Sequence, residues 1–243
     1  RVPSVLSALL VVVGWYTPNR VSDSPIFEAA IEQAEDLPRL PAMEVLRERP
    51  LAILLGSGLR VGENISYYIL TVFSLTYLVD VAAETRGLAL RALLIGAAVQ
   101  FFAIPLLARL SDRIGRRPVY AFGAFGLALF IFAFFPLLAS GEPAWIISAL
   151  VAGLFFHAAM YGPQAAFITE LFPTRIRYSG VSIAYQLTSI VAGSLAPIIA
   201  LWLYKETGSA TPVAIYVAAA CVISGVSALL AGETKGVELA AVQ

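Results

Sequence analysis

The sequence predicts an all-α, polytopic membrane protein, and two observations support this fold class. Hydrophobic residues occupy 59% of the 243 positions and charged residues only 13%, with a mean hydropathy of +0.83. Soluble domains carry about 25% charged residues. The apolar residues are also gathered into long runs separated by short polar breaks, which is typical of helices that cross a bilayer. The alternating ten-residue strands of a membrane barrel are absent.

Six of these runs approach or exceed the length of about 20 residues that a membrane-spanning helix needs. We expect spanning helices at Leu51–Val79, Leu88–Leu107, Pro118–Leu138, Ala144–Phe167, Ser179–Leu203 and Pro212–Ala231. Gly162-Pro163 interrupts the fourth run near its end, and proline removes a backbone hydrogen bond. We therefore expect a kink, and a candidate hinge, at that point.

Two segments precede the six runs. Val2–Tyr16 is apolar but short of a full span, and we interpret it as the remaining part of a cut helix. The linker at 19–50 carries four basic and seven acidic residues, and a short helix is expected at Met43–Glu48. We interpret the linker as a solvated connection. The predicted organisation is thus the end of a transmembrane helix at 1–17, a central loop at 18–50, a six-helix bundle at 51–232 and a tail at 233–243.

The basic residues predict the orientation of the bundle. Segments 17–50, 109–117, 170–178 and 232–243 carry eleven of the sixteen basic residues, and the opposite face carries four. Loops rich in Lys and Arg stay on the cytoplasmic side. We therefore expect these segments, including the C-terminus, to lie in the cytoplasm of a cell whose plasma membrane, the inner membrane in bacteria, holds the bundle.

The first full run contains a pair of charges deep in the expected membrane. Arg60 and Glu63 are i, i+3 neighbours, and Arg60 lies about 14 Å along the axis from Leu51. Each charge costs about 2.5–3.5 kcal/mol at the membrane centre, whereas an i, i+3 pair returns only about 0.2–0.5 kcal/mol in water. One interpretation is an intrahelical ion pair that fixes packing. The other is a water-filled cavity in which Arg60 holds an anionic substrate group and Glu63 exchanges a proton.

Other polar side chains fall on helix faces that can line the same cavity. On a helical wheel, Arg60 and Glu63 share a face with Ser57, Asn64, Tyr67, Thr71 and Ser74. Further candidates for substrate or proton binding in later runs are Gln100, His157, Tyr161, Gln164, Tyr185 and Gln186. Each stripe taken alone also fits ordinary interhelical hydrogen bonding. His157, the only histidine, is either a proton acceptor or a packed hydrogen-bonding group.

The sequence gives no indication of an enzyme. It lacks a Gly-rich phosphate loop, a Cys/His metal spacing, a G-x-S-x-G and an H-E-x-x-H motif. We therefore expect no cofactor and no metal site, and the net charge of zero predicts no nucleic-acid partner. Without a nucleotide site, any transport must be driven by an ion or solute gradient.

Two loops resemble signatures of a known family. Ala108–Arg117 reads A-R-L-S-D-R-I-G-R-R and resembles the major facilitator superfamily loop G-x-L-[AS]-D-R-x-G-R-R, with Ala108 in place of the first glycine. Tyr161–Gly180 reads Y-G-P-Q-A-A-F-I-T-E-L-F-P-T-R-I-R-Y-S-G and resembles the tenth-helix signature of the metabolite:proton symporters. That branch includes shikimate, dicarboxylate and proline/betaine permeases. Glu233–Gly236 is similar to the superfamily's end-of-half motif.

The resemblance implies a proton-coupled transporter that works by alternating access, with this chain as its C-terminal half. The partners it implies are a small-molecule substrate, protons, the lipid bilayer and an N-terminal six-helix half, without which we expect the chain to be inactive. Asp112 would dock near Tyr178–Val181 at the eleventh helix. The implied gating residues are Asp112, Arg113, Gly115, Arg116, Arg117, Glu170 and Arg175.

The resemblance to the superfamily does not identify the substrate. The sugar-porter branch typically carries Q-Q-x-S-G on the seventh helix, where this chain carries Arg60, Glu63 and Asn64. An organic acid or a zwitterionic metabolite is therefore favoured over a sugar. A sugar-porter-like carrier remains an alternative, as does a receptor or assembly subunit that uses the scaffold without transport. A charge pair facing a cavity favours transport, and a pair packed dry favours the non-transporting alternative.

Overall fold

The structure is a computed structural model that describes residues 41–236. The helix end expected at 1–17, the linker up to residue 40 and the last seven residues of the tail lie outside this range. Every regular element from 41 to 236 is a helix. The elements are α3 (Pro41–Glu48), α4 (Pro50–Tyr68), η1 (Ile69–Phe73), α5 (Ser74–Thr76), η2 (Tyr77–Val81), α6 (Arg86–Ile114), α7 (Arg116–Leu138), α8 (Pro143–Glu170), α9 (Arg177–Thr188), η3 (Ser189–Gly193), α10 (Ala196–Thr207) and α11 (Thr211–Ala231).

Five helical segments in the described range are long and apolar enough to cross a membrane. They are Pro50–Val81, Arg86–Ile114, Arg116–Leu138, Pro143–Glu170 and Thr211–Ala231. Each coincides with one of the six expected runs, and the short helix expected at Met43–Glu48 is α3. The long helix α8 continues through Pro163, so the expected interruption does not divide it.

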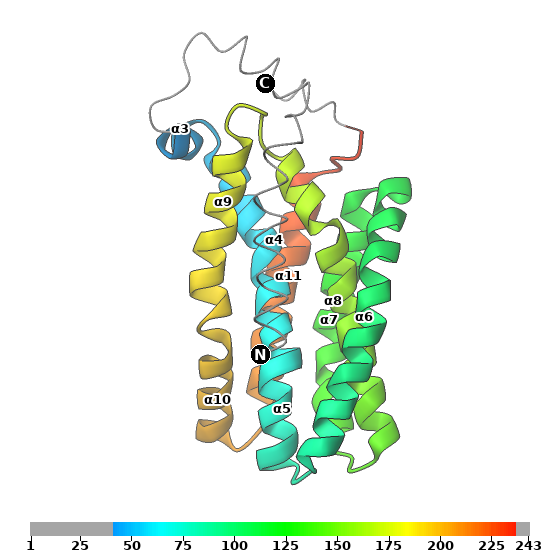
Figure 1. Cartoon of the computed structure of the whole chain (residues 1–243). Coiled ribbons are helices and arrows are strands. Elements are labelled where there is room, and N and C mark those ends of the chain that lie inside the picture. The colour runs from blue at the N-terminus through cyan, green and yellow to red at the C-terminus, as the bar shows by residue number, and fades with distance from the viewer. Residues whose placement is uncertain (1–40, 237–243) are drawn as a thin grey trace, which may run out of the picture. The chain divides into compact units, whose positions relative to one another are not determined.

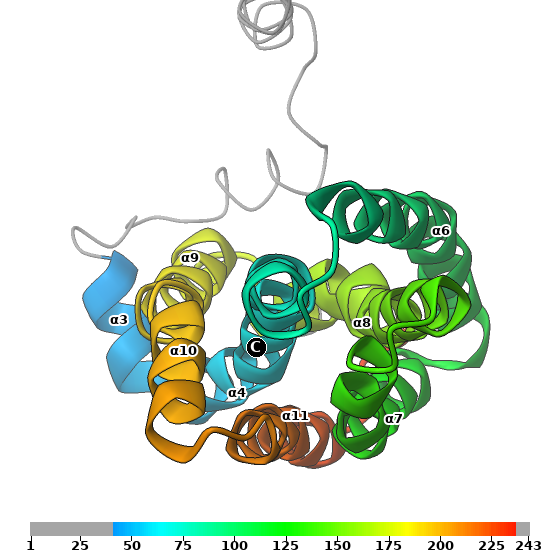
Figure 2. The same ribbon diagram turned by 90° about the horizontal axis from the view of Figure 1, so that it is seen from below.

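The expectation of one continuous helix over Ser179–Leu203 is wrong. This run is divided into α9, the π-helical turn η3 and α10, with a turn at Ser194 and Leu195 between η3 and α10. Pro197 stands in the first turn of α10, where the lack of its N–H costs nothing. Figures 1 and 2 show α9 and α10 stacked end to end along one side of the bundle, so together they take the place of the missing span.

The helix α4 lies in the middle of the bundle. Seen along the helices in Figure 2, α9 and α10 lie on one side of α4, and α6, α7 and α8 lie on the other. α11 packs against both α4 and α7, and α8 packs against α6 and α7. Three polar residues of α4, Glu63, Asn64 and Ser66, are therefore buried among other helices.

Close contact between α4 and α11 depends on a glycine. A Cβ atom at Gly62 would lie 2.6 Å from the Ala220 carbonyl oxygen and 2.8 Å from the Cys221 Cα. The absence of that atom lets the two backbones approach, which is how small residues act in membrane helices. The hydroxyl of Ser224 then accepts a hydrogen bond from the Gly62 N–H at 2.8 Å and donates to the Gly58 carbonyl at 2.6 Å.

π-helical turns change the faces that a regular helix would present. A π turn adds a residue to the α-helical repeat, and α4 is followed by two of them, η1 and η2. The polar stripe expected on a 100° wheel therefore does not continue beyond Tyr67. Thr71 and Ser74 instead donate hydrogen bonds to the carbonyls of Tyr67 and Leu70, four residues earlier.

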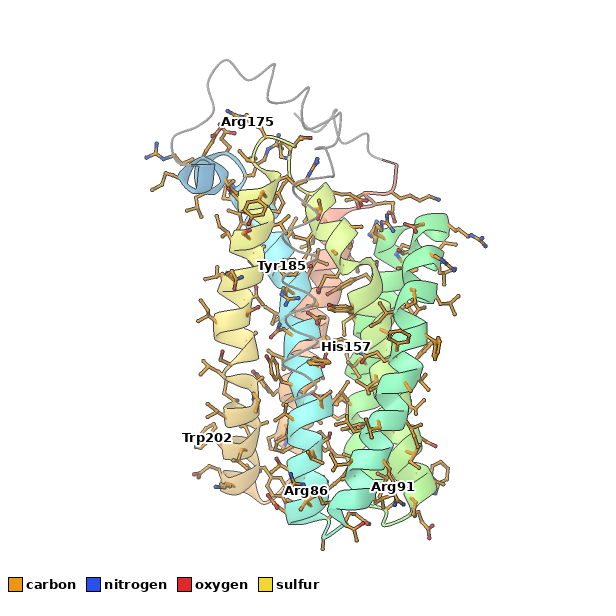
Figure 3. All side chains as sticks on the ribbon, viewed as in Figure 1. Arg86, Arg91, His157, Arg175, Tyr185 and Trp202 are labelled. Carbon is orange, nitrogen blue, oxygen red and sulfur yellow. The ribbon has the colours of Figure 1, made fainter. Side chains whose placement is uncertain are left out.

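Two ends of the bundle differ in chemistry. The end formed by α3, the α6–α7 turn and residues 232–236 is here called the basic end, because the segments that carry most of the Lys and Arg residues lie there. Arg175 lies at this end, whereas Arg86, Arg91 and Trp202 lie at the opposite end (Figure 3). Trp145 and Trp202 are 56% and 59% exposed, and tryptophans favour the membrane–water interface. Figure 3 places His157 about midway between the two ends.

Candidate functional site

Arg60 and Glu63 form the centre of a buried polar cluster on α4. The Arg60 Nη1 donates to Glu63 Oε2 at 2.9 Å, and their side chains are only 14% and 5% exposed. The i, i+3 spacing predicted this contact, and the structure confirms it. Both residues belong to α4. The residues around them are mostly apolar, so this helix runs through the bundle and its two charged side chains lie inside it.

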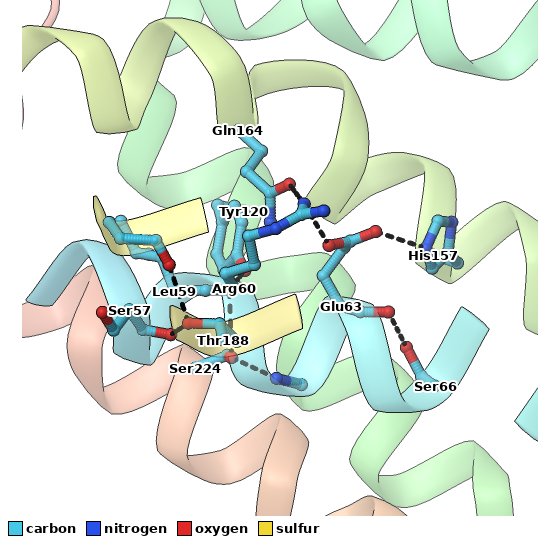
Figure 4. A network of polar contacts seen from close by, with 12 residues as sticks. Ser57, Leu59, Arg60, Glu63, Ser66, Tyr120, His157, Gln164, Thr188 and Ser224 are labelled. Carbon is cyan, nitrogen blue, oxygen red and sulfur yellow. Dashed lines mark hydrogen bonds and ion pairs between the residues drawn. The ribbon is translucent and has the colours of Figure 1, made fainter. Parts of the chain in front are cut away.

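The second oxygen of Glu63 contacts another helix. His157 Nε2 lies 3.2 Å from Glu63 Oε1, and Gln100 Nε2 lies 2.7 Å from His157 Nδ1. His157 belongs to α8 and Gln100 to α6, and both side chains are buried. Three helices therefore contribute to one chain of hydrogen bonds, Gln100–His157–Glu63–Arg60, of which Figure 4 shows the part from His157 to Arg60.

Arg60 has two further partners besides Glu63. Its Nη1 also donates to Gln164 Oε1 of α8 at 3.0 Å. The guanidinium carbon lies 4.1 Å from the centre of the Tyr185 ring on α9, a cation–π contact worth about 0.5–2 kcal/mol. These contacts hold the guanidinium in a fixed position at the middle of the membrane-spanning bundle.

A cavity of about 390 Å³ opens beside these residues. It is lined by Arg60, Glu63, Asn64, Tyr67, Tyr68, Gln100, Ile104, His157 and Tyr161. Ligand cavities in proteins are about 300–1,000 Å³ and combine aromatic walls with a few polar groups. Arg60 Nε and Asn64 Oδ1 have no hydrogen-bond partner among the described residues, so the cluster keeps unused hydrogen-bonding capacity.

Most of the predicted binding residues meet at this cavity. The rings of Tyr67 and Tyr161 lie 5.2 Å and 5.9 Å from the His157 ring. Gln164 and Tyr185 do not line the cavity themselves, but both contact Arg60, which does. Gln186 is not brought to the cluster, because its side chain is exposed on α9 and does not line the cavity.

Sequence reasoning missed Tyr68 and Ile104, which also line the cavity. A helical wheel places Tyr68 beside the polar face rather than on it, and Ile104 is apolar. The helical wheel therefore marks neither residue.

The basic end contains a second polar cluster, which is built on the turn between α6 and α7. Gly115 makes this turn with φ +114°, a conformation that side chains rarely adopt. The backbone N–H groups of Arg116 and Arg117, the first residues of α7, donate to the Glu233 carboxylate at 2.8 and 3.2 Å. A carboxylate at a helix N-terminus satisfies these N–H groups and meets the positive end of the helix dipole.

Arg116 and the C-terminal segment extend this second cluster to α8. Arg116 forms ion pairs with Asp112 and, at 3.4 Å, with Glu170, and it donates to the Ser111 hydroxyl at 2.9 Å. Thr234 donates to Glu170, and the Lys235 ammonium donates to the Arg113 carbonyl. The ends of α6, α7, α8 and α11 are therefore tied together at the basic end.

Two of the expected gating contacts are different in the structure. Asp112 was expected to dock at the start of α9, but it pairs with Arg116 four residues later and is 57% exposed. The carboxylate that binds a helix N-terminus is Glu233, at α7. Arg175 does not join the Arg116 cluster. It pairs with Glu44 and Glu48 of α3 instead, the latter at 3.4 Å.

Within 41–236, no group of three or more His, Cys, Asp or Glu side chains is arranged to hold a metal ion.

Comparison with known proteins places the chain among transporters. A family model described as "Sugar (and other) transporter" matches residues 30–243. The inner membrane metabolite transport protein YhjE of Escherichia coli is 34% identical over 242 residues, which cover 97% of this chain and 54% of that protein. The shikimate transporter of Escherichia coli is 34% identical over 239 residues, with the same coverage.

A third relative is more distant. The proline/betaine transporter of Escherichia coli is 27% identical over 249 residues, covering 96% of this chain and 48% of that protein. The chain spans about half the length of the curated relatives it matches. No solved structure matches it. The match of the family model over most of the chain, together with these relatives, shows that the chain belongs to the sugar (and other) transporter family of the major facilitator superfamily.

Proposed function

We propose that this chain is the C-terminal half of a proton-coupled transporter that carries a small organic acid or a zwitterionic metabolite by alternating access. The observation that carries the proposal is the cavity beside Arg60 and Glu63. Relatives named as transporters of metabolites, shikimate and proline/betaine support the substrate class. The other wall of the substrate site would come from a second six-helix half.

The cavity favours transport over the non-transporting alternative. In a receptor or assembly subunit, the charge pair would serve packing alone and would be surrounded by side chains. Here the pair lines a volume of about 390 Å³ together with Asn64, Gln100 and Tyr161. Buried ionisable groups at membrane depth are costly, and they are typically kept where they face a substrate or proton pathway.

In the proposed mechanism, the substrate and Glu63 compete for Arg60. A substrate carboxylate that enters the cavity takes the guanidinium, and Glu63 Oε2 loses its positive partner. An ionised carboxylate without a counter-charge is unstable in this surrounding, so Glu63 binds a proton from the cavity at Oε2. Substrate binding and proton binding thereby become mutually dependent, which is the requirement for symport.

The basic end would lie in the cytoplasm and act as the gate on that side. The excess of Lys and Arg there supports this orientation. The contacts of Glu233 with the start of α7, and of Arg116 with Asp112 and Glu170, hold four helix ends together. We propose that these contacts break when the cavity opens to the cytoplasm.

Uptake of labelled organic acids and betaines by cells that express the full-length protein tests the proposal. We compare wild type with Glu63→Gln, with and without a proton uncoupler, and use Glu142→Gln, an exposed carboxylate at the opposite end, as the matched control. The uncoupler should abolish accumulation by wild type and by the control. Glu63→Gln should lose accumulation but keep exchange of substrate across the membrane. Normal accumulation by Glu63→Gln would contradict the proposed role of this residue.

A further inference from the structure

Gln100 has no part in the mechanism proposed above, although it lies at the end of the buried hydrogen-bond chain. Its side chain is 8% exposed, and His157, its partner, is 2% exposed. The 2.7 Å contact between Gln100 Nε2 and His157 Nδ1 joins α6 to α8. A glutamine that is hydrogen-bonded to a ring nitrogen restricts the orientation and the tautomer of that imidazole.

The contact selects one tautomer of His157. The Gln100 amide N–H donates, so His157 Nδ1 accepts and carries no hydrogen. In a neutral imidazole the hydrogen is then on Nε2. That atom lies 3.2 Å from Glu63 Oε1, so the ring donates a hydrogen bond to the carboxylate. Gln100 thus aims the donor of His157 at Glu63 without touching Glu63 itself.

We propose that Gln100 is a positioning residue that, through His157, sets the pH at which Glu63 takes up its proton. The inference rests on the proposed function, since it concerns the same carboxylate. A hydrogen bond donated to the charged form of a carboxyl group favours that form. The contact of His157 with Oε1 therefore opposes proton binding, and it leaves Oε2, the oxygen shared with Arg60, as the position where the proton is accepted.

The other charged or titratable groups around Glu63 and His157 make no hydrogen bond with the Gln100 side chain in the described structure. The charged or titratable side chains that line the cavity with Glu63 and His157, or interact electrostatically with Glu63, are Arg60, Tyr67 and Tyr68 from α4, Tyr161 from α8, Tyr120 from α7 and Tyr185 from α9. In the described structure Gln100 makes its side-chain hydrogen bond to His157 alone. A substitution of Gln100 by an uncharged side chain should therefore change proton binding only by way of His157.

Two uncharged substitutions of Gln100 have the same expected effect. Gln100→Leu removes the donor to Nδ1, so the ring no longer holds its Nε2–H toward Glu63 and the carboxylate binds a proton more readily. Gln100→Met also lacks the donor and differs from leucine in shape. The pH midpoint of proton-coupled uptake should rise by roughly one pH unit in both variants.

The experiment measures the pH midpoint of uptake by the full-length protein in liposomes, with the melting temperature of the purified protein as the measure of correct folding. Both substitutions are repeated in a His157→Phe background, where neither should move the midpoint. A rise in the His157 protein and no shift in the His157→Phe protein support the inference. A fall in the midpoint, or a shift that persists without His157, overturns it.

The outcome also separates the inference from the proposed function. A wild-type midpoint that neither substitution moves overturns the role of Gln100 and leaves proton coupling intact. A wild-type protein whose uptake has no dependence on pH overturns both.

Discussion

The carboxylate of Glu63 lies 3.2 Å from Nε2 of His157, a residue that follows it by 94 positions and belongs to another helix. Because the other oxygen contacts Arg60, Glu63 links an ion pair within α4 to a histidine on α8. A change in the charge of any one of the three groups therefore alters the hydrogen bonds of the other two.

Arg60→Lys tests whether the guanidinium is needed or only its charge. A lysine keeps a positive charge near Glu63, but it lacks the planar fork that reaches both Glu63 and Gln164 and stacks on Tyr185. We expect KM for the substrate to rise about tenfold or more. Arg91→Lys, an exposed position at the opposite end, is the control. An unchanged KM in Arg60→Lys would show that a point charge is sufficient.

Gly62→Ala tests the contact between α4 and α11. The new Cβ atom would lie 2.6 Å from the Ala220 carbonyl oxygen, and overpacking of this kind costs about 1–3 kcal/mol. We expect a lower melting temperature for the purified full-length protein. Gly87→Ala is the matched control, because no atom lies within 4 Å of a Cβ built there. Equal melting temperatures for the two variants would argue against the close contact.

Glu233→Gln tests the cap at the start of α7. Partial burial raises the pKa of Glu233, but the backbone N–H groups of Lys235, Arg116, Arg117 and Thr234 lower it more, so its pKa is below the ordinary value of 4.5. A group whose pKa is lowered by folding stabilises the protein above its unfolded-state pKa and loses this effect as the pH falls through the folded-state pKa.

We therefore expect wild type to be more stable than Glu233→Gln by about 0.5–1 kcal/mol at pH 7, a modest value because the side chain is exposed. The difference in melting temperature should be constant down to about pH 5 and should shrink below about pH 4. Glu206→Gln at the opposite end is the control. A difference that grows as the pH falls would contradict the assignment of the cap to an ionised Glu233.

The sequence predicted the parts of this molecule that depend on local spacing. The Arg60–Glu63 contact followed from i, i+3 geometry, and the five continuous spans followed from hydropathy. The shared face of His157 and Tyr161, whose rings are stacked, followed from i, i+4 spacing.

The parts that depend on contacts between helices were not predictable in this way. A helical wheel gives the face of a residue but not the depth at which two helices align, so the meeting of Gln100, His157 and Glu63 had no local signal. The π-helical turns have no sequence signature, and Thr71 and Ser74, which lie within and after the first of them, do not line the cavity. Pro197 indicates a break before α10, but a proline at this position is also compatible with a continuous helix, so the sequence alone did not predict the break.

The most direct test of the central account is proton movement that is caused by substrate. Full-length protein in liposomes with no imposed gradient is given a substrate, and the pH of the external medium is followed with an electrode. The account predicts that wild type takes up protons with the substrate, so the medium becomes alkaline, and that Glu63→Gln, which keeps substrate exchange, leaves the pH unchanged. Alkalinisation of the same size with Glu63→Gln would contradict the account, because the proton would then be carried by another group.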